Sequence, residues 1–227
     1  MKKIIIPFFC LTLFSTPYFA QTAKNTKVEA IKGTLTAKQV LDKYFEAMGG
    51  KQKLEAVKSV IIEGTMSVQG MEISSVTKKM GNKFKYSQTV MGQDMLQVFD
   101  GEKGYVKQMG KEASLTPEQI EKFKKGKTID VLAMDTPEKM TSVTVEKLDG
   151  KDYNVLTSEK GKFYFDAATH LLYKTLAEGA EIIVKDYITQ EGIKFPGTTE
   201  IKAQGQEIVM KNTKVTLNSG VTEADFK

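Results

Sequence analysis

The chain has 227 residues, a formal net charge of +5 at neutral pH and a mean hydropathy of -0.29. Every cationic side chain is a lysine, because the sequence contains no arginine, and there is one cysteine and no tryptophan. Arginine supplies the planar fork that reads guanine edges and holds phosphate in two-point contacts, so the composition argues against nucleic-acid binding, and a single cysteine excludes a disulfide within the chain.

Residues 1–20 have the layout of a secretory signal peptide. Two lysines precede an apolar run, 4–14, and small or polar residues follow as far as Ala20. The apolar run is much shorter than the roughly 20 residues that a membrane-spanning helix needs, and no later stretch approaches that length. We therefore expect export, cleavage near Ala20 and no transmembrane segment.

A folded domain is expected from 36 to 227, after a flexible leader, 21–35, which has few large apolar side chains. The domain begins with a helix, because Thr36 and Gln39 have the spacing of a capping box and two glycines, Gly49–Gly50, can cap its C-terminus. Apolar residues with helical spacing lie between them: Val40, Leu41, Tyr44, Ala47 and Met48.

A series of strands follows the first helix. Apolar and polar residues alternate over about ten residues from Val60 to Val68, which predicts a half-buried strand. Turn residues then recur about every 10 to 14 residues, so we expect an antiparallel meander of eleven or twelve strands. One helix, Pro117 to Lys125, interrupts it after a capping box, and 128–140 is expected to be irregular or helical.

The number of strands determines the expected fold class. Long twisted sheets rarely stay open and flat, so the prediction is a mainly β, single-domain protein with one curved antiparallel sheet. This sheet forms an incomplete, half-open barrel of about eleven strands, with short α-helices as a lid over its mouth or concave face. Such an architecture can hold an apolar ligand.

The segment GKFYFDAATHLLYK contains the only histidine, His170, four residues after Asp166. Imidazole titrates near neutral pH, so this is the first place to seek catalysis or a metal. One histidine cannot supply the two or three imidazoles common at catalytic zinc, and no serine stands in a GxSxG turn. We predict that Phe163 and Phe165 share one face of a strand, that His170 lies exposed in the following turn, and that the protein has no catalytic residues, metal or cofactor.

Five segments, in this order, carry a resemblance to a known family: VLDKYFEAMGGKQKLEAVKSVIIEGTM, FDGEKGYV, FYFDAATHLLYK, DYITQEGIKFPGTTEI and LNSGVTEADF. From about Ala37 to Phe226 the chain resembles the LolA-like outer-membrane lipoprotein-sorting proteins. The resemblance implies an incomplete barrel of about eleven strands with a helical lid, and a non-enzymatic periplasmic carrier. The implied partners are lipoprotein acyl chains or another lipid, and an inner- or outer-membrane protein; we expect a monomer.

The chain departs from the family in one respect. Known LolA carriers couple lid closure to cargo through an arginine, and this sequence has none. A lysine could substitute only as a point charge, so the residue that performs this coupling is not transferred.

The residues expected to line the apolar cavity follow from the alternation of each strand. A register shift of one residue would move the whole set to the other face. Methionines are numerous, and their flexible thioethers suit a surface that accepts varied shapes or simply fill a curved core. The candidate cavity residues are Val60, Ile62, Met66, Val68, Phe84, Tyr86, Met95, Phe99, Phe163 and Phe165.

Alternatives to a carrier stay open. An envelope sensor or protein-interaction module on the same fold would bind a protein on its curved face, and a hydrolase would need His170 as its base. Four lysines between 122 and 127 are either a solvated helix end or a contact for anionic lipid or an acidic partner.

Overall fold

The computed structural model describes residues 31–32, 34–90 and 92–227. The predicted signal peptide, 1–20, and most of the predicted leader lie outside these residues. The strands are β1 (Ile31–Lys32), β2 (Ser59–Val68), β3 (Met71–Met80), β4 (Lys83–Val90), β5 (Gln93–Phe99), β6 (Gly104–Gln108), β7 (Lys111–Ser114), β8 (Met140–Leu148), β9 (Lys151–Ser158), β10 (Gly161–Asp166), β11 (Leu172–Ala177), β12 (Ala180–Val184), β13 (Tyr187–Gln190), β14 (Ile193–Pro196), β15 (Thr198–Ala203) and β16 (Gln206–Leu217). The α-helices are α1 (Ala37–Met48), α2 (Lys51–Ala56) and α3 (Pro117–Phe123), and the 3₁₀ helices are η1 (Asp130–Met134), η2 (Pro137–Lys139) and η3 (Glu223–Phe226).

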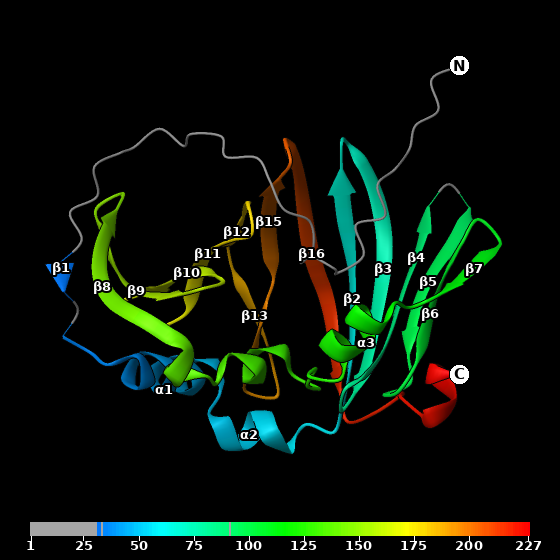
Figure 1. Ribbon diagram of the computed structural model, residues 1–227, viewed down its shortest axis with the longest axis horizontal. Coiled ribbons are helices and arrows are strands. Elements are labelled where there is room, and N and C mark those ends of the chain that lie inside the picture. Colours follow the sequence, from blue (N-terminus) through cyan, green and yellow to red (C-terminus); the bar gives the residue numbers. More distant parts are fainter. Residues whose placement is uncertain (1–30, 33, 91) are drawn as a thin grey trace.

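In the described part of the chain, fourteen strands form one antiparallel sheet with the order β1-β8-β9-β10-β11-β12-β15-β16-β2-β3-β4-β5-β6-β7. The end strands β1 and β7 are not paired with each other, so the sheet does not close. Figure 1 shows the strands side by side in a broad curve, with α1 and α2 at its lower end. The predicted mainly β, incomplete barrel with short helices is confirmed.

The sheet has more strands than the sequence predicted. Strand β1 has two residues and lies within the expected leader, and β7 has four residues, all exposed. Both strands are too short for an alternation to show. Strands β13 and β14 lie between β12 and β15 in sequence but leave the large sheet and form a separate two-stranded ribbon.

The ribbon leaves the sheet at a bend formed by Asp186 and Gly197. The backbone N–H of Gly197 donates to the carbonyl oxygen of Asp186 (2.9 Å), and the N–H of Thr198 donates to Asp186 Oδ1 (2.8 Å). A Cβ on Gly197 would lie 1.9 Å from Asp186 Oδ1, so a residue with a side chain cannot occupy this position without displacing the aspartate. The bend directs the ribbon toward α1, with which β14 is in contact.

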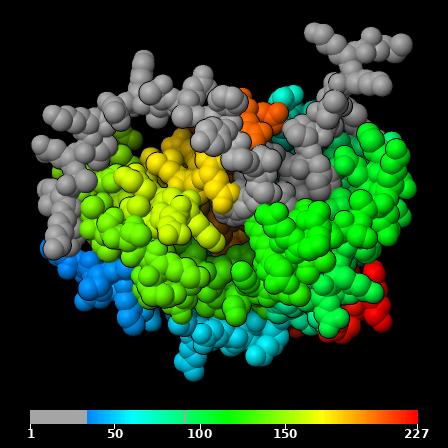
Figure 2. All heavy atoms as spheres, in the orientation of Figure 1, coloured from blue at the N-terminus to red at the C-terminus, as the bar shows by residue number. Residues whose placement is uncertain are grey.

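Helices α1 and α3 pack on one face of the sheet, which we call the inner face. The rings of Tyr44 in α1 and Phe165 in β10 lie 5.0 Å apart, and those of Phe123 in α3 and Phe84 in β4 lie 4.7 Å apart. Figure 2 shows the segment that contains α3, η1 and η2, in green, across the front of the molecule. The predicted lid therefore has two separate anchor points on the sheet.

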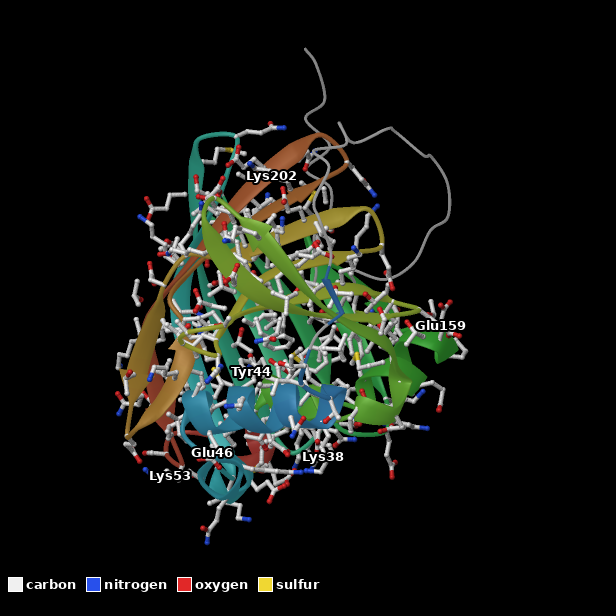
Figure 3. The ribbon with its side chains drawn as sticks, turned by 90° about the vertical axis from the view of Figure 1, so that its left-hand side faces the viewer. Lys38, Tyr44, Glu46, Lys53, Glu159 and Lys202 are labelled. Carbon is white, nitrogen blue, oxygen red and sulfur yellow. The ribbon has the colours of Figure 1, made fainter. Side chains whose placement is uncertain are left out.

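Helix α1 has the amphipathic pattern that its sequence predicted. Thr36 and Gln39 form the capping box, and Gly49 ends the helix with a φ of 128°. Figure 3 shows Tyr44 on the side of α1 that faces the sheet, whereas Lys38 and Glu46 lie on the opposite side. The apolar face of α1 forms part of the main core: Val40, Leu41, Tyr44, Phe45 and Met48 are all buried.

The turn that contains His170 is built by Asp166. Oδ1 of Asp166 accepts hydrogen bonds from the backbone N–H groups of Ala168 (2.9 Å) and Thr169 (2.8 Å). Burial alone would raise the pKa of Asp166, but these hydrogen bonds outweigh it and hold the pKa below its ordinary value. His170 follows with a φ of 60° and is half-buried, not exposed as predicted. The carboxylate of Asp166 therefore stabilises the backbone of the turn.

The close pairing of β2 and β16 leads to a prediction for Gly64. A Cβ at this position would lie 2.2 Å from the carbonyl oxygen of Lys211, beside the register irregularity of β16. Gly64→Ala is expected to lower the free energy of unfolding by about 1–3 kcal/mol, because the two strands must separate to admit the methyl group. Urea denaturation measures the effect. Ser67→Ala, on the other face of the same strand, should cost about 0.5 kcal/mol or less, and an equal loss in both variants would contradict the steric account.

Candidate functional site

An apolar cavity of about 300 Å³ lies between the inner face of the sheet, α1 and η1. Strands β2, β14 and β16 form its floor and one wall, and the helices form the other side. Its apolar lining consists of Tyr44, Met48, Val60, Ile62, Ile129, Val131, Met134, Phe195 and Pro196, and its polar lining of Thr128, Asp130, Lys194 and Asn212. The volume lies at the lower end of the range for small-molecule pockets, roughly 300–1,000 Å³.

The buried wall of the cavity next to α1 is uncharged. Burial raises the pKa of Tyr44 well above its ordinary value, and burial likewise raises the pKa of Tyr187 in β13. The hydroxyl of Tyr187 donates to the carbonyl oxygen of Leu172 (2.7 Å). Tyr187 does not line the cavity but packs against the same core. The phenol of Tyr44 stays protonated at neutral pH, and this wall offers a ligand aromatic and aliphatic surface.

Two ion pairs hold η1 over the cavity. Lys79, on the inner face of β3 and only 9% exposed, is paired with Asp130 of η1. Lys51 of α2 is paired with Asp135 just after η1, and the hydrogen bond to Asp135 raises the pKa of Lys51. A third polar contact joins the two loops beside η1, since the N–H of Gly81 donates to Thr128 Oγ1 (2.8 Å).

The pair of Lys79 and Asp130 should respond asymmetrically to substitution. Asp130→Asn is expected to lower the free energy of unfolding by about 1 kcal/mol, because it leaves a nearly buried ammonium without its counter-charge, while exposure of the carboxylate limits the loss. Lys79→Met should leave stability unchanged or slightly higher, since a thioether suits the surrounding apolar wall. Urea denaturation measures both. Equal losses in the two variants would show that the ion pair itself is stabilising.

The ten residues predicted to line the cavity all lie on the inner face. The cross-strand pairs connect them from β2 through β3 to β4 and β5, and from β9 to β10. Val60 and Ile62 line the cavity itself. That the whole set contacts a ligand stays a prediction.

The remaining eight predicted residues form three groups of two or three and one separate residue, Tyr86. Phe163 and Phe165 pack in the main core beneath α1. Phe84 and Phe99 pack against Phe123 of α3, with ring centroids 4.7 and 5.7 Å from it. Met66, Val68 and Met95 belong to a second apolar cluster farther along the inner face, and Tyr86 donates from its hydroxyl to Gln88 Oε1 (3.0 Å).

Sequence reasoning missed the side of the cavity that the helices provide. The helical spacing of Tyr44 and Met48 places them only on the apolar face of a helix, and Val131 and Met134 lie in a segment without periodicity. Phe195 comes from the ribbon whose bend at Gly197 the sequence pattern did not show. Helical spacing was the available evidence for the first two residues, and no local pattern identified the others.

Other features of the described residues do not provide a second site. A depression of about 490 Å³ at two hairpin tips, lined by 158–161 and 176–181, is wide open to solvent and cannot bury an acyl chain. The described residues hold no cluster of three or more His, Cys, Asp or Glu side chains that could bind a metal. Within the same residues, no helix is both long and apolar enough to span a membrane.

Comparisons with known proteins find similarity in structure. No family model and no curated protein matches the sequence. A DUF1329 family protein from Desulfovibrio piger has 12% identity and a TM-score of 0.56, over 86% of this chain and 98% of the other. A LolA superfamily protein from Nitrosomonas europaea has 13% identity and a TM-score of 0.53, over 86% and 98% of the two chains.

A third solved structure, from Vibrio parahaemolyticus, is a domain assigned to the outer membrane lipoprotein-sorting proteins. It has 14% identity and a TM-score of 0.56, over 84% of this chain and 97% of the other. At this level of sequence identity the similarity shows the fold, and it covers nearly the whole length of each of the three compared chains. The half-open sheet with its helical lid is therefore the fold of the LolA-like proteins.

Proposed function

We propose that this chain is a periplasmic carrier that binds acyl chains of a lipid or lipoprotein, without catalysing a reaction. The observation that carries the proposal is the apolar cavity between α1, η1 and the inner face of the sheet. The LolA-like fold supports a carrier role by analogy, because one of the similar structures is assigned to lipoprotein sorting. The predicted signal peptide supports the location.

The size of the cavity supports a ligand that is held only in part. Burial of an acyl chain contributes about 0.8 kcal/mol per methylene, so ten methylenes would give roughly 8 kcal/mol before the costs of ordering. A cavity of about 300 Å³ is small for a diacylated lipid. We therefore expect η1 and α3 to move when a larger ligand binds.

The lid has contacts that can be broken and remade. Helix α3 has no fully buried residue, and its anchor on the sheet is the ring of Phe123 against Phe84 and Phe99. The η1 segment is held by ion pairs with Lys51 and Lys79. Such contacts cost less to open than the packed core under α1, which suits a carrier that must release its cargo.

The test starts with the protein purified from the periplasm of a host that has an outer membrane. Native mass spectrometry and lipid extraction should recover a lipid or lipopeptide in stoichiometric amount. The delipidated protein should enhance the fluorescence of 1-N-phenylnaphthylamine, and a diacylated lipopeptide should displace this probe. Absence of recovered lipid together with absence of probe binding would refute the carrier proposal. A single stoichiometric membrane-protein partner, bound without lipid, would favour an envelope sensor.

A further inference from the structure

A band of polar side chains crosses the apolar inner face at the middle of β3, β4 and β5. The cross-strand pairs place Thr77, Tyr86 and Gln97 in one row, and Ser75 and Gln88 in the next. On a sheet, residues in directly opposed positions have their Cβ atoms about 4.5–5.5 Å apart. The five side chains therefore form a continuous polar strip.

Apolar surface lies on both sides of this strip. Toward the helices, Phe84 and Phe99 meet Phe123 of α3. In the other direction, the second apolar cluster contains Met66 and Ile73 together with Val90, Met95, Ile201 and Ile208. An extended acyl ligand on the inner face would therefore contact apolar surface, then the polar strip, then apolar surface again.

Gln97 is exceptional among the polar side chains of this strip. It is only 1% exposed, and neither its Nε2 nor its Oε1 has a hydrogen-bond partner among the described residues. The backbone of the same strand is paired on both sides, with β4 and β6. Buried amides without partners are rare in native proteins, because they lose their hydrogen bonds to water and gain none in return.

Gln88 provides the contrast. Its Oε1 accepts from the hydroxyl of Tyr86 (3.0 Å), and its Nε2 lies 3.2 Å from the sulfur of Met95. Both glutamines lie on the inner face of neighbouring strands, but only the amide of Gln88 is satisfied within the protein. The unsatisfied amide of Gln97 consequently needs a partner that the fold does not supply.

We infer that Gln97 is a specificity-determining residue that binds the carbonyl-containing linkage of an acyl ligand. Its Nε2 donates to the carbonyl oxygen of the linkage. A trans amide directs its C=O and N–H to opposite sides, so one linkage meets one atom of the side chain. Its carbonyl oxygen is a stronger acceptor than that of an ester, and an alkane offers no acceptor. The inference rests on the proposed function and adds the class of ligand: acyl chains joined through an amide, in preference to esters and plain hydrocarbon.

The test compares three ligands of equal chain length, N-methyldodecanamide, methyl dodecanoate and dodecane, as competitors of 1-N-phenylnaphthylamine. The wild-type protein is expected to bind the amide about tenfold more tightly than the alkane, with the ester between them. Gln97→Met should remove this ranking and leave the affinity for dodecane within about twofold. Gln88→Met is the matched control, and it should keep the ranking.

Stability gives an independent measurement on the delipidated protein. Gln97→Met is expected to raise Tm by about 2–4 °C, because it removes an unsatisfied buried amide. Gln88→Met should lower Tm, since it breaks the hydrogen bond with Tyr86. A fall in Tm for Gln97→Met, equal to that of the control, would overturn the inference.

The outcomes separate the two proposals. If none of the three ligands displaces the probe from the wild-type protein, the carrier function itself fails. If all three displace it but Gln97→Met keeps the preference for the amide, only the role of Gln97 fails. NMR of the wild-type protein tests the contact directly. The side-chain NH₂ resonances of Gln97 should shift with N-methyldodecanamide and not with dodecane, and identical shifts for both ligands would refute the assigned contact.

Discussion

Ile62→Glu is expected to weaken the binding of an acyl chain by at least about 100-fold. Ile62 lines the cavity on β2, opposite the lid segment that contains Met134. In the empty cavity water can hydrate the new carboxylate, so the loss of folding stability should be modest. A bound acyl chain would expel that water and leave the charge in apolar surroundings, which costs several kcal/mol. Displacement of 1-N-phenylnaphthylamine measures the affinity, and urea denaturation measures the stability.

The neighbouring residue provides a matched control. Ile61 is on the same strand and is half-buried like Ile62, but its side chain points to the outer face, beside Gly220. Ile61→Glu introduces the same charge into the same strand and should change the affinity for an acyl chain by about twofold or less. Equal loss of binding in the two variants would mean that the cavity between α1 and η1 does not hold the ligand.

The face of the sheet that carries the candidate residues could be predicted because alternation has a period of two. Val60 and Phe84 are far apart in sequence, yet the hairpin turns between them keep each strand in a register that places both on the inner face. Once the register of one hairpin is fixed, the side-chain direction of the next strand follows. This is why the predicted residues all share one face, although no local pattern shows which face the helices cover.

The position of the cavity on that face could not be predicted in the same way. It depends on η1, whose sequence has no sustained periodicity, and on the bend at Asp186 and Gly197, which turns Phe195 toward α1. Both features are set by contacts between residues far apart in sequence. Gln97 escaped the prediction for a different reason: a rule that selects apolar residues on alternate positions passes over a polar residue on the same face.

The second large effect concerns the core beneath α1. Phe165→Ala is expected to lower the free energy of unfolding by about 3–5 kcal/mol. Phe165 is 1% exposed, and its ring lies 5.0 Å from that of Tyr44 in an edge-to-face arrangement. Its removal leaves a void between β10 and α1 that the sheet cannot close, because β10 is paired on both sides with β9 and β11. Urea denaturation followed by circular dichroism measures the loss.

Phe163→Ala is the matched control, since Phe163 has the same side chain on the same face of the same strand but is only partly buried. It should cost about half as much, because part of its surface is already in water.

Helix α1 forms one side of the cavity, so the packing that holds it in place should also affect how fast a ligand enters. Phe165→Ala loosens α1 and should raise the rate at which 1-N-phenylnaphthylamine enters, whereas Phe163→Ala should leave that rate nearly unchanged. Similar stability losses and similar rates for the two variants would show that α1 is not anchored through Phe165 and that other core residues hold it in place.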